Sequence, residues 1–157
     1  MKLDRIDFEI LRALQEDARI SNKELAEMNG ISPSTSHERV RRLREEGVLT
    51  GVHAEVSPDA MGIGIEAMIS IRLRQHTEIP FEALFKEISE IDEVVNVYLL
   101  AGAVDFLVHV AVRDVQHLRI VVLDTFTARY EISHIETALI FEFTHSSTLP
   151  NYQTSDK

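Results

Sequence analysis

The spacing of apolar residues changes near residue 50, and this change divides the chain into two parts. Before that point, apolar residues recur every three or four positions, which is the period of an amphipathic helix. After it, segments with an apolar residue at every second position alternate with helix-like segments, which indicates strands between helices. The sequence therefore predicts an α+β protein whose first part is helical and whose second part is mixed.

Three helices are predicted in the first part, and each begins at a recognisable capping residue. Ser21 with Glu24 three positions later forms a capping box, and Gly30 suits the end of that helix. Ser32 can cap the next helix, with Pro33 in the first helical position that proline favours. The predicted helices cover residues 4–17, 21–30 and 32–46.

The second part predicts the order strand, helix, strand, strand, helix, strand, the ferredoxin-like βαββαβ arrangement. The strands are predicted within "IEAMISIRLR", "VVNVYLLA", "DFLVHVAV" and "HIETALIFEFTH", and the helices follow Pro80 and Asp114. The first helix carries an apolar stripe of Phe81, Leu84, Phe85, Ile88 and Ile91. The residues of the second helix expected to face inward are Val115, Leu118, Val122 and Phe126. One face of the last strand is predicted to hold Ile135, Thr137, Leu139, Phe141 and Phe143.

The predicted domains are a helix-turn-helix domain at 1–50, a β hinge or linker at 51–64, a ferredoxin-like domain at 65–148 and a polar tail at 149–157. In the ferredoxin-like arrangement both helices lie on one face of the sheet, so the other face needs a cover. The two middle strands are apolar on both faces, with Leu99 beside Leu100 and Leu107 beside Val108. A second copy of the sheet is the simplest cover, which predicts a homodimer.

Composition narrows the classes of function. The chain has 157 residues, no cysteine and 16 basic against 26 acidic residues, a net charge of −10. No apolar run approaches the ~20 residues of a membrane helix, and the acidic N-terminus is unlike a signal peptide, so we expect a cytoplasmic protein. Histidines lack compact ligand spacing, and no G-x-S-x-G, P-loop or paired-carboxylate motif occurs, so we expect no metal, no cofactor and no enzyme.

One helix stands out in this acidic chain, because Arg39, Arg41, Arg42 and Arg44 occur within six positions. As the second helix of a helix-turn-helix, it would enter the major groove of DNA with its N-terminal residues near the bases. Arginine binds phosphate or a guanine edge in bidentate fashion, and Arg41 and Arg42 are the strongest candidates. The candidate DNA-binding residues are Ser32, Ser34, Thr35, Ser36, His37, Arg39, Arg41 and Arg42. The alternative is a solvated helix whose arginines pair with Glu38, Glu45 and Glu46.

Two segments carry a resemblance to a known family: "LDRIDFEILRALQEDARISNKELAEMNGISPSTSHERVRRLREEGVLTG" and "LLAGAVDFLVHV". From Leu3 to about Thr148 the chain resembles the Lrp/AsnC, or feast/famine, family of transcriptional regulators. The resemblance implies a winged-type helix-turn-helix that binds double-stranded DNA. It also implies a ferredoxin-like domain that pairs subunits and binds an amino acid or related metabolite, and dimers that build tetramers or octamers.

The turn "AGAVDF" is the expected effector site. By position, Gly102 matches the glycine of the family motif, Asp105 its second aspartate and Phe106 its aromatic residue, whereas Ala103 and Val104 replace an aspartate and an aromatic residue. A tight turn here is expected to use the unusual φ that glycine allows at Gly102, and the Asp105 carboxylate could bind an ammonium group. The effector-site residues that the resemblance implies are Tyr98, Ala101, Gly102, Ala103, Asp105, Val115, Ala138, Leu139 and Ile140.

Three alternatives stay open in the sequence. Asp105 can be an ordinary turn residue that caps its own backbone. The chain can be an architectural DNA binder without an effector. It can also be a ligand-sensing or enzymatic ferredoxin-like protein with an incidental basic helix, although helices before residue 50 would then have no purpose.

Overall fold

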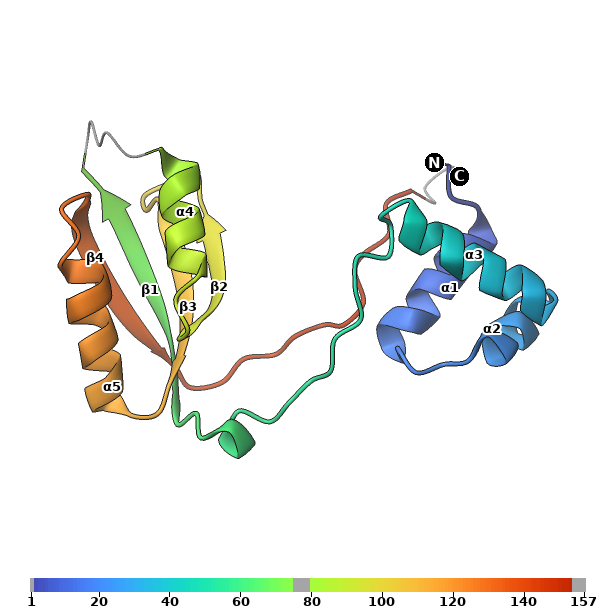
Figure 1. Cartoon of the computed structure of the whole chain (residues 1–157), viewed down its shortest axis with the longest axis horizontal. Helices are drawn as coiled ribbons and strands as arrows, with labels where there is room; N and C mark the ends of the chain where they lie inside the picture. Colours follow the sequence, from blue (N-terminus) through green and yellow to red (C-terminus); the bar gives the residue numbers. More distant parts are fainter. Residues whose placement is uncertain (1, 75–79, 154–157) are drawn as a thin grey trace. The chain divides into compact units, whose positions relative to one another are not determined.

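The computed structural model describes residues 2–74 and 80–153, which form two compact units (Figure 1). The first unit contains the chain up to Glu55 together with the segment from Thr144 onward, and the second contains Val56–Phe143. Residues 144–148 were predicted to belong to the ferredoxin-like domain, but they lie in the helical unit. There the Leu149 backbone N–H donates a hydrogen bond of 2.9 Å to Gln15 Oε1 of the first helix.

The first unit consists of α1 (Arg5–Glu16), α2 (Asn22–Asn29) and α3 (Pro33–Glu45), which confirms the three predicted helices. Asp4, Ser21 and Ser32 are the N-caps, and each side chain accepts a bond from a backbone N–H of the first turn. Gly30 ends α2 with a left-handed φ of 64°, a conformation that costs glycine little. The core of this unit is made of Ile10, Ala13, Leu14, Leu25, Val40 and Leu43.

Residues 51–57 have no regular secondary structure, and a single 3₁₀ turn follows at Asp59–Met61. The alternating pattern in this segment had allowed either a strand or a hinge. An extended segment needs a neighbouring strand to complete its hydrogen bonds, and none lies beside it among the described residues of this chain. The described residues of this chain thus form no strand in this segment, and its role as a hinge stays a prediction.

The second unit is a four-stranded antiparallel sheet with strand order β2-β3-β1-β4, covered on one face by helices (Figure 1). Its elements are β1 (Ile65–Leu73), α4 (Phe81–Ser89), β2 (Val94–Leu99), β3 (Phe106–Val112), α5 (Val115–Ile120), the π-helix η2 (Val121–Thr127) and β4 (Ile132–Ile140). Their order confirms the predicted βαββαβ arrangement. In the centre of the sheet, Ile69 lies between Val108 of β3 and Thr137 of β4.

Alternation along the central strands gives the sheet two unlike faces. Every second residue of β1 and β3 packs against the helices, as predicted. The inward residues of this core are Ala67, Ile69, Ile71, Phe106, Val108, Val110 and Val112 from the sheet, and Leu84, Ile88, Leu118, Val121 and Phe126 from the helices. The opposite face carries side chains such as Met68, Ser70 and His109.

One inward position of the second predicted helix, Val115, was predicted wrongly. Val115 is 59% exposed, and Val121 is buried in its helix instead. Val115 is the first residue of α5, directly after the N-cap Asp114, whereas the π-helical turn that follows places the buried Val121 and Phe126 five positions apart. Phe81 is 45% exposed at the first position of α4, although its ring lies 6.3 Å from that of Phe106.

Two strand predictions also need correction. The last strand ends at Ile140, so Phe141 and Phe143 lie beyond it and are exposed. Of the two strands expected to be buried on both sides, β3 is central but β2 is an edge strand, and its Leu99 is 52% exposed. An apolar edge strand is a surface that another chain can cover.

Among the described residues, no helix combines the length and apolar character needed to cross a membrane. Within the same residues, no group of three or more histidine, aspartate or glutamate side chains is placed to hold a metal ion.

Candidate nucleic-acid interface and effector site

Helix α3 is fixed in the first unit by its buried face. Val40 and Leu43 lie in the core, and the N-cap Ser32 accepts a hydrogen bond of 3.1 Å from the Thr35 backbone N–H. The turn before it is closed by the Ile31 N–H, which donates to the Ala26 carbonyl at 3.0 Å. The opposite face of α3 is exposed, which is the arrangement that a recognition helix requires.

The N-terminal turn of α3 presents a cluster of hydroxyl groups. Ser32 Oγ lies 2.9 Å from Ser34 Oγ and 2.8 Å from Thr35 Oγ1, and all three residues are exposed. Hydroxyls can both donate and accept, so this cluster can contact either phosphate or base edges. Ser36 is different, because it is fully buried and its Oγ has no hydrogen-bond partner within the described part of the chain. The prediction that Ser36 lies at a base edge is therefore wrong for this structure.

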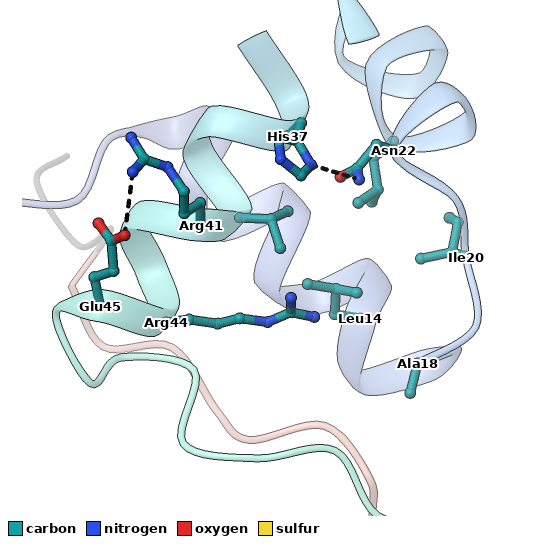
Figure 2. Close-up of a pocket in the computed structure, with 10 residues that line it drawn as sticks. Leu14, Ala18, Ile20, Asn22, His37, Arg41, Arg44 and Glu45 are labelled. Carbon is teal, nitrogen blue, oxygen red and sulfur yellow. Dashed lines mark hydrogen bonds and ion pairs between the residues drawn. The ribbon is translucent and has the colours of Figure 1, made fainter. Parts of the chain in front are cut away.

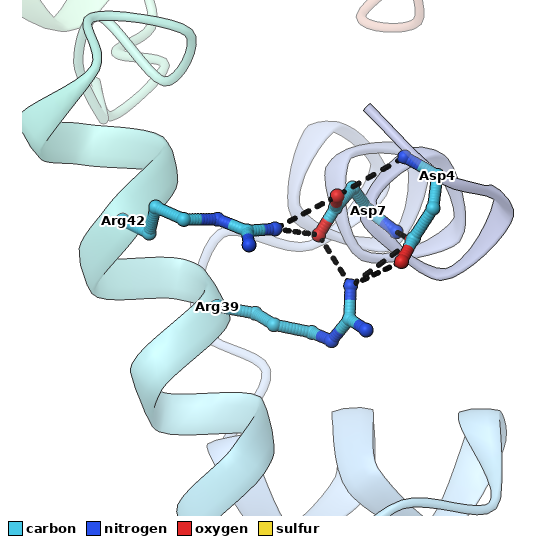
Figure 3. Close-up of polar contacts among 4 residues, drawn as sticks. All are labelled: Asp4, Asp7, Arg39 and Arg42. Atoms are coloured by element: carbon cyan, nitrogen blue, oxygen red, sulfur yellow. Dashed lines mark hydrogen bonds and ion pairs between the residues drawn. The ribbon is translucent and has the colours of Figure 1, made fainter. Parts of the chain in front are cut away.

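Arg39 and Arg42 are held by a carboxylate of α1, as Figure 3 shows. Arg39 Nη1 donates to Asp4 and to Asp7 Oδ1, both at 2.8 Å, and Arg42 Nη2 donates to Asp7 Oδ1 and Oδ2 at 3.0 and 2.9 Å. The Asp7 side chain is completely buried, whereas the Arg39 side chain is 20% exposed and that of Arg42 is 44% exposed. Arg39 thus ties α3 to α1, and Arg42 keeps part of its guanidinium at the surface.

The same ion pairs shift two pKa values. The pKa of Asp4 lies below its ordinary value, first because its carboxylate accepts the Asp7 backbone N–H and then because Arg39 donates to it. The pKa of Arg39 is raised, because Asp4 and Asp7 both stabilise its charged form. These groups are therefore charged at neutral pH and keep α3 in place.

Arg41 is paired within α3 itself. Its Nε donates to Glu38 at 3.2 Å and its Nη1 to Glu45 at 3.2 Å, while its side chain is 53% exposed. The pKa of Glu38 is lowered because Arg41 donates to its carboxylate. The alternative in which glutamates of the helix compensate its arginines thus holds for Arg41 in the free chain, although exposed pairs of this kind are weak enough to exchange for DNA.

The expected effector turn is attached to β1. The Leu73 N–H donates a 2.7 Å bond to Asp105 Oδ2, and the Asp105 N–H donates to the Ile71 carbonyl at 2.9 Å. Arg72 Nε donates to the Ala103 carbonyl at 2.9 Å. Asp105 is half-buried and binds the neighbouring strand rather than its own turn, which leaves Oδ1 as the oxygen for any ligand.

Gly102 does not have the conformation expected of it. The three glycines with a left-handed φ are Gly30, Gly47 and Gly62, and Gly102 is not among them. The turn closes instead through the Leu100 N–H, which donates to the Asp105 carbonyl at 2.8 Å. No atom lies within 4 Å of the position that a Cβ at residue 102 would take, so neither φ nor space demands glycine here.

The predicted effector residues separate into two groups at opposite ends of β1. Tyr98, Ala101, Gly102, Ala103 and Asp105 belong to the turn or the end of β2, which lies near Ile71. At the other end of β1, residues 66–68 pair with Ala138, Leu139 and Ile140. Val115 lies near this end too, because it follows Val112, the β3 residue that pairs with Ile65. Five residues of strand separate Glu66 from Ile71, roughly 17 Å. A single chain therefore does not bring the two groups together.

Sequence reasoning missed two residues of the first unit. Asp7 was not a candidate, although it lies three positions after the N-cap Asp4 and faces two arginines from α3. Arg44 was not among the candidate DNA-binding residues, but it is exposed and lies at the edge of a cleft beside α2 (Figure 2).

Comparisons with known proteins agree with this architecture. A winged helix-turn-helix DNA-binding model matches residues 3–50, and the Lrp/AsnC ligand-binding domain matches residues 66–149. The HTH-type transcriptional regulator AldR of Mycolicibacterium smegmatis is 46% identical over 140 residues, covering 89% of this chain and 82% of that protein. The regulatory protein AsnC of Escherichia coli is 32% identical over 89% of this chain and 91% of its own length.

A solved structure extends the likeness to three dimensions. The transcriptional regulator NMB0573 of Neisseria meningitidis, crystallised as an L-Met complex, has a TM-score of 0.87 and 27% identity, covering 95% of this chain and 97% of that one.

Proposed function

The chain belongs to the Lrp/AsnC family of DNA-binding transcriptional regulators, and from this premise we propose that it reads specific DNA sites through α3 and responds to an amino acid or related metabolite. The observation that carries the proposal is the exposed N-terminal turn of α3, with Ser34, Thr35 and His37 on a helix anchored by Asp7. Such a regulator acts on chromosomal DNA, and we infer that it does so in the cytoplasm. Regulators of this family are not enzymes.

Each predicted contact residue has a role in this proposal. Ser32, Ser34, Thr35 and His37 face the bases or the nearest phosphates, and Arg41 exchanges its glutamates for a guanine edge or a phosphate. Arg42 shares its guanidinium between Asp7 and DNA. Arg39 holds the helix in place, and Ser36 leaves the list because it is buried.

We propose a homodimer formed through the face of the sheet that α4 and α5 leave uncovered. On this face His109 is only 7% exposed, with Asn96 Nδ2 at 3.3 Å and Glu66 Oε1 at 3.2 Å, and the Phe143 ring lies edge-on at 6.3 Å. The buried His109 Nε2 has no hydrogen-bond partner within the described part of the chain, so a second sheet that supplied one would stabilise the covered face. A two-fold dimer would place two copies of α3 in successive major grooves, ~34 Å apart.

The effector site is proposed to form between subunits, since the two groups of candidate residues lie at opposite ends of β1 in one chain. The turn of one subunit would meet Val115 and the 138–140 segment of another, in a tetramer or octamer built from dimers. The L-Met complex of the similar Neisseria regulator supports an amino acid as the ligand. Asp105 Oδ1 would bind the ammonium group of this amino acid. Backbone N–H groups of the turn would bind its carboxylate.

The test is a selection of genomic DNA fragments by the purified protein, with and without a mixture of amino acids. We expect a short set of enriched fragments that share a half-symmetric site, and a changed set when the mixture is present. A variant with Ser34→Ala and His37→Ala serves as the control that keeps the fold but loses base contacts. Enrichment of all fragments alike would contradict specific regulation, and an unchanged set would favour an architectural DNA binder.

A further inference from the structure

The four arginines of α3 differ in how far carboxylates compensate their charge. Arg39 and Arg42 bind Asp7, and Arg41 binds Glu38 and Glu45. Arg44 has no ion pair with any residue in the part of the chain that the structure describes. Its exposed guanidinium thus keeps its full positive charge toward solvent.

Arg44 lies at a cleft of about 270 Å³ between the C-terminal half of α3, the start of α2 and the end of α1. Figure 2 shows Arg44 extending from α3 toward Leu14 of α1, while Arg41 turns away toward Glu45. The apolar part of the lining consists of Leu14, Ala18, Ile20, Leu25 and Val40. Glu45 is the acidic residue of the lining, and it already accepts a bond from Arg41.

Two further polar groups line the same cleft. Asn22, the first residue of α2, is hydrogen-bonded to His37 of α3, with 3.3 Å between Asn22 Nδ2 and His37 Nδ1 (Figure 2). This bond ties the start of α2 to the exposed face of α3. The cleft therefore combines one uncompensated cation with hydrogen-bonding groups and apolar walls, which suits an anion whose oxygens need several donors.

We infer that Arg44 binds a phosphate of the DNA backbone at this cleft, with Asn22 and His37 beside it. The inference rests on the proposed function, in which α3 lies in the major groove. In a helix-turn-helix the helix before the recognition helix crosses the DNA backbone, so the start of α2 and the flank of α3 that carries Arg44 face the same strand. The guanidinium supplies the planar pair of N–H groups that phosphate oxygens accept.

The inference divides the roles of the arginines. Binding of Arg44 to phosphate neutralises one backbone charge and releases counterions, which makes affinity depend on salt. Arg41 brings its own two glutamates to the interface, so its contribution to this salt dependence is small, and its value lies in reading a base.

The experiment measures the affinity of the full-length protein for one enriched DNA fragment, by fluorescence anisotropy, from about 50 to 200 mM salt. Arg44→Ala is expected to lower the slope of log K against log salt by about 0.9, so that its affinity relative to wild type changes about 3.5-fold across that range. Arg44→Lys keeps the charge and is expected to keep the slope. Arg12→Ala, which removes an exposed arginine of α1 that pairs with Glu16, is the matched control.

The outcomes separate this inference from the proposed function. If Arg44→Ala binds DNA with the salt slope of the wild-type protein, Arg44 does not bind a phosphate, and the proposed function as a DNA-binding regulator is unaffected. Failure of the wild-type protein to bind any fragment would instead count against the proposed function. NMR signals of the arginine Nε groups provide a second arm: duplex DNA is expected to shift the Arg44 signal, and a shift with inorganic phosphate alone would assign the cleft to free anions.

Discussion

The guanidinium of Arg42 in α3 donates two hydrogen bonds, of 3.0 and 2.9 Å, to the buried carboxylate of Asp7 in α1 (Figure 3). Asp7 also binds Arg39 and accepts the Asp4 backbone N–H at 3.1 Å, so one carboxylate joins the cap of the first helix to the middle of the recognition helix. The orientation of the DNA-reading surface therefore depends on a residue that lies outside it.

Replacement of Asp7 should destabilise the helical unit. Asp7→Asn removes the charge that compensates two arginines, one of them largely covered. Because Arg39 keeps Asp4 and both arginines are partly exposed, the cost in the free energy of unfolding should be about 1–3 kcal/mol, less than for a fully buried pair. Urea unfolding followed by circular dichroism measures this loss, with Arg12→Ala as the control at an exposed pair. A loss below about 0.5 kcal/mol would show that Asp7 does not anchor α3.

Acid should weaken the same unit. The pKa values of Asp4 and Glu24 are lowered from 3.8 and 4.5, in Asp4 chiefly by the Asp7 N–H and in Glu24 chiefly by the Ser21 hydroxyl. A carboxyl group with a lowered folded pKa stabilises the fold above its unfolded pKa, and this stabilisation is lost as the pH falls through the folded pKa. Melting temperatures should thus be steady above about pH 5 and fall below about pH 4. Asp4→Asn should flatten the decline, and an equally steep decline in that variant would contradict the assignment.

Replacement of Ser36, unlike that of Asp7, should not destabilise the helical unit. Its buried hydroxyl lacks a hydrogen-bond partner, and such a group costs about 1–3 kcal/mol. Ser36→Ala should keep or raise the free energy of unfolding, by up to about 1 kcal/mol, and should leave DNA affinity unchanged. A marked loss of affinity in a well-folded variant would return Ser36 to the contact surface.

Arg41→Ala should weaken binding to a preferred DNA fragment by about 1–3 kcal/mol if its guanidinium reads a base. The loss should be much smaller on unrelated DNA, because Glu38 and Glu45 offset the charge that Arg41 brings. Competition between the two DNA types measures the difference. Equal losses on both would assign Arg41 to a phosphate instead.

Asp105→Asn separates the ligand role of this residue from its structural role. The amide oxygen of asparagine can still accept the Leu73 N–H, so the turn should hold its shape while the negative charge is lost. Calorimetric titration with the responsive amino acid should show affinity at least about tenfold weaker, since a hydrogen bond to a charged group contributes about 1.5–3 kcal/mol. Unchanged affinity would place the ammonium group elsewhere.

The elements of this fold were predictable where the signal is local. Ser21 with Glu24, and Ser32 before Pro33, determine helix starts within four residues, so all three N-terminal helices were predicted closely. The pairing of Asp7 with Arg39 and Arg42 was not, because it joins residues 32 and 35 positions apart and depends on how α1 packs on α3. The π-helical turn at Val121–Thr127 has no comparable local signal, and it buries Val121 and Phe126 five positions apart.

The candidate site was predictable to a similar depth. The exposed residues of α3 follow from helical periodicity, whereas the compensation of Arg41 and the free charge of Arg44 depend on rotamers and neighbouring helices. The sequence also presented Tyr98 and Leu139 as one effector set. Strand register alone reveals that they belong to different ends of the sheet.

The separation of the effector residues between the two ends of β1 has a consequence for the amount of protein in the cell. If neither end of a lone sheet forms a whole pocket, the capacity to detect a nutrient rises with the number of copies in the cell, since the sensor is created by encounter. At a low protein concentration, the metabolite would not be bound even when the metabolite is abundant. A regulator that controls its own synthesis would thereby set the protein concentration at which it begins to bind the metabolite.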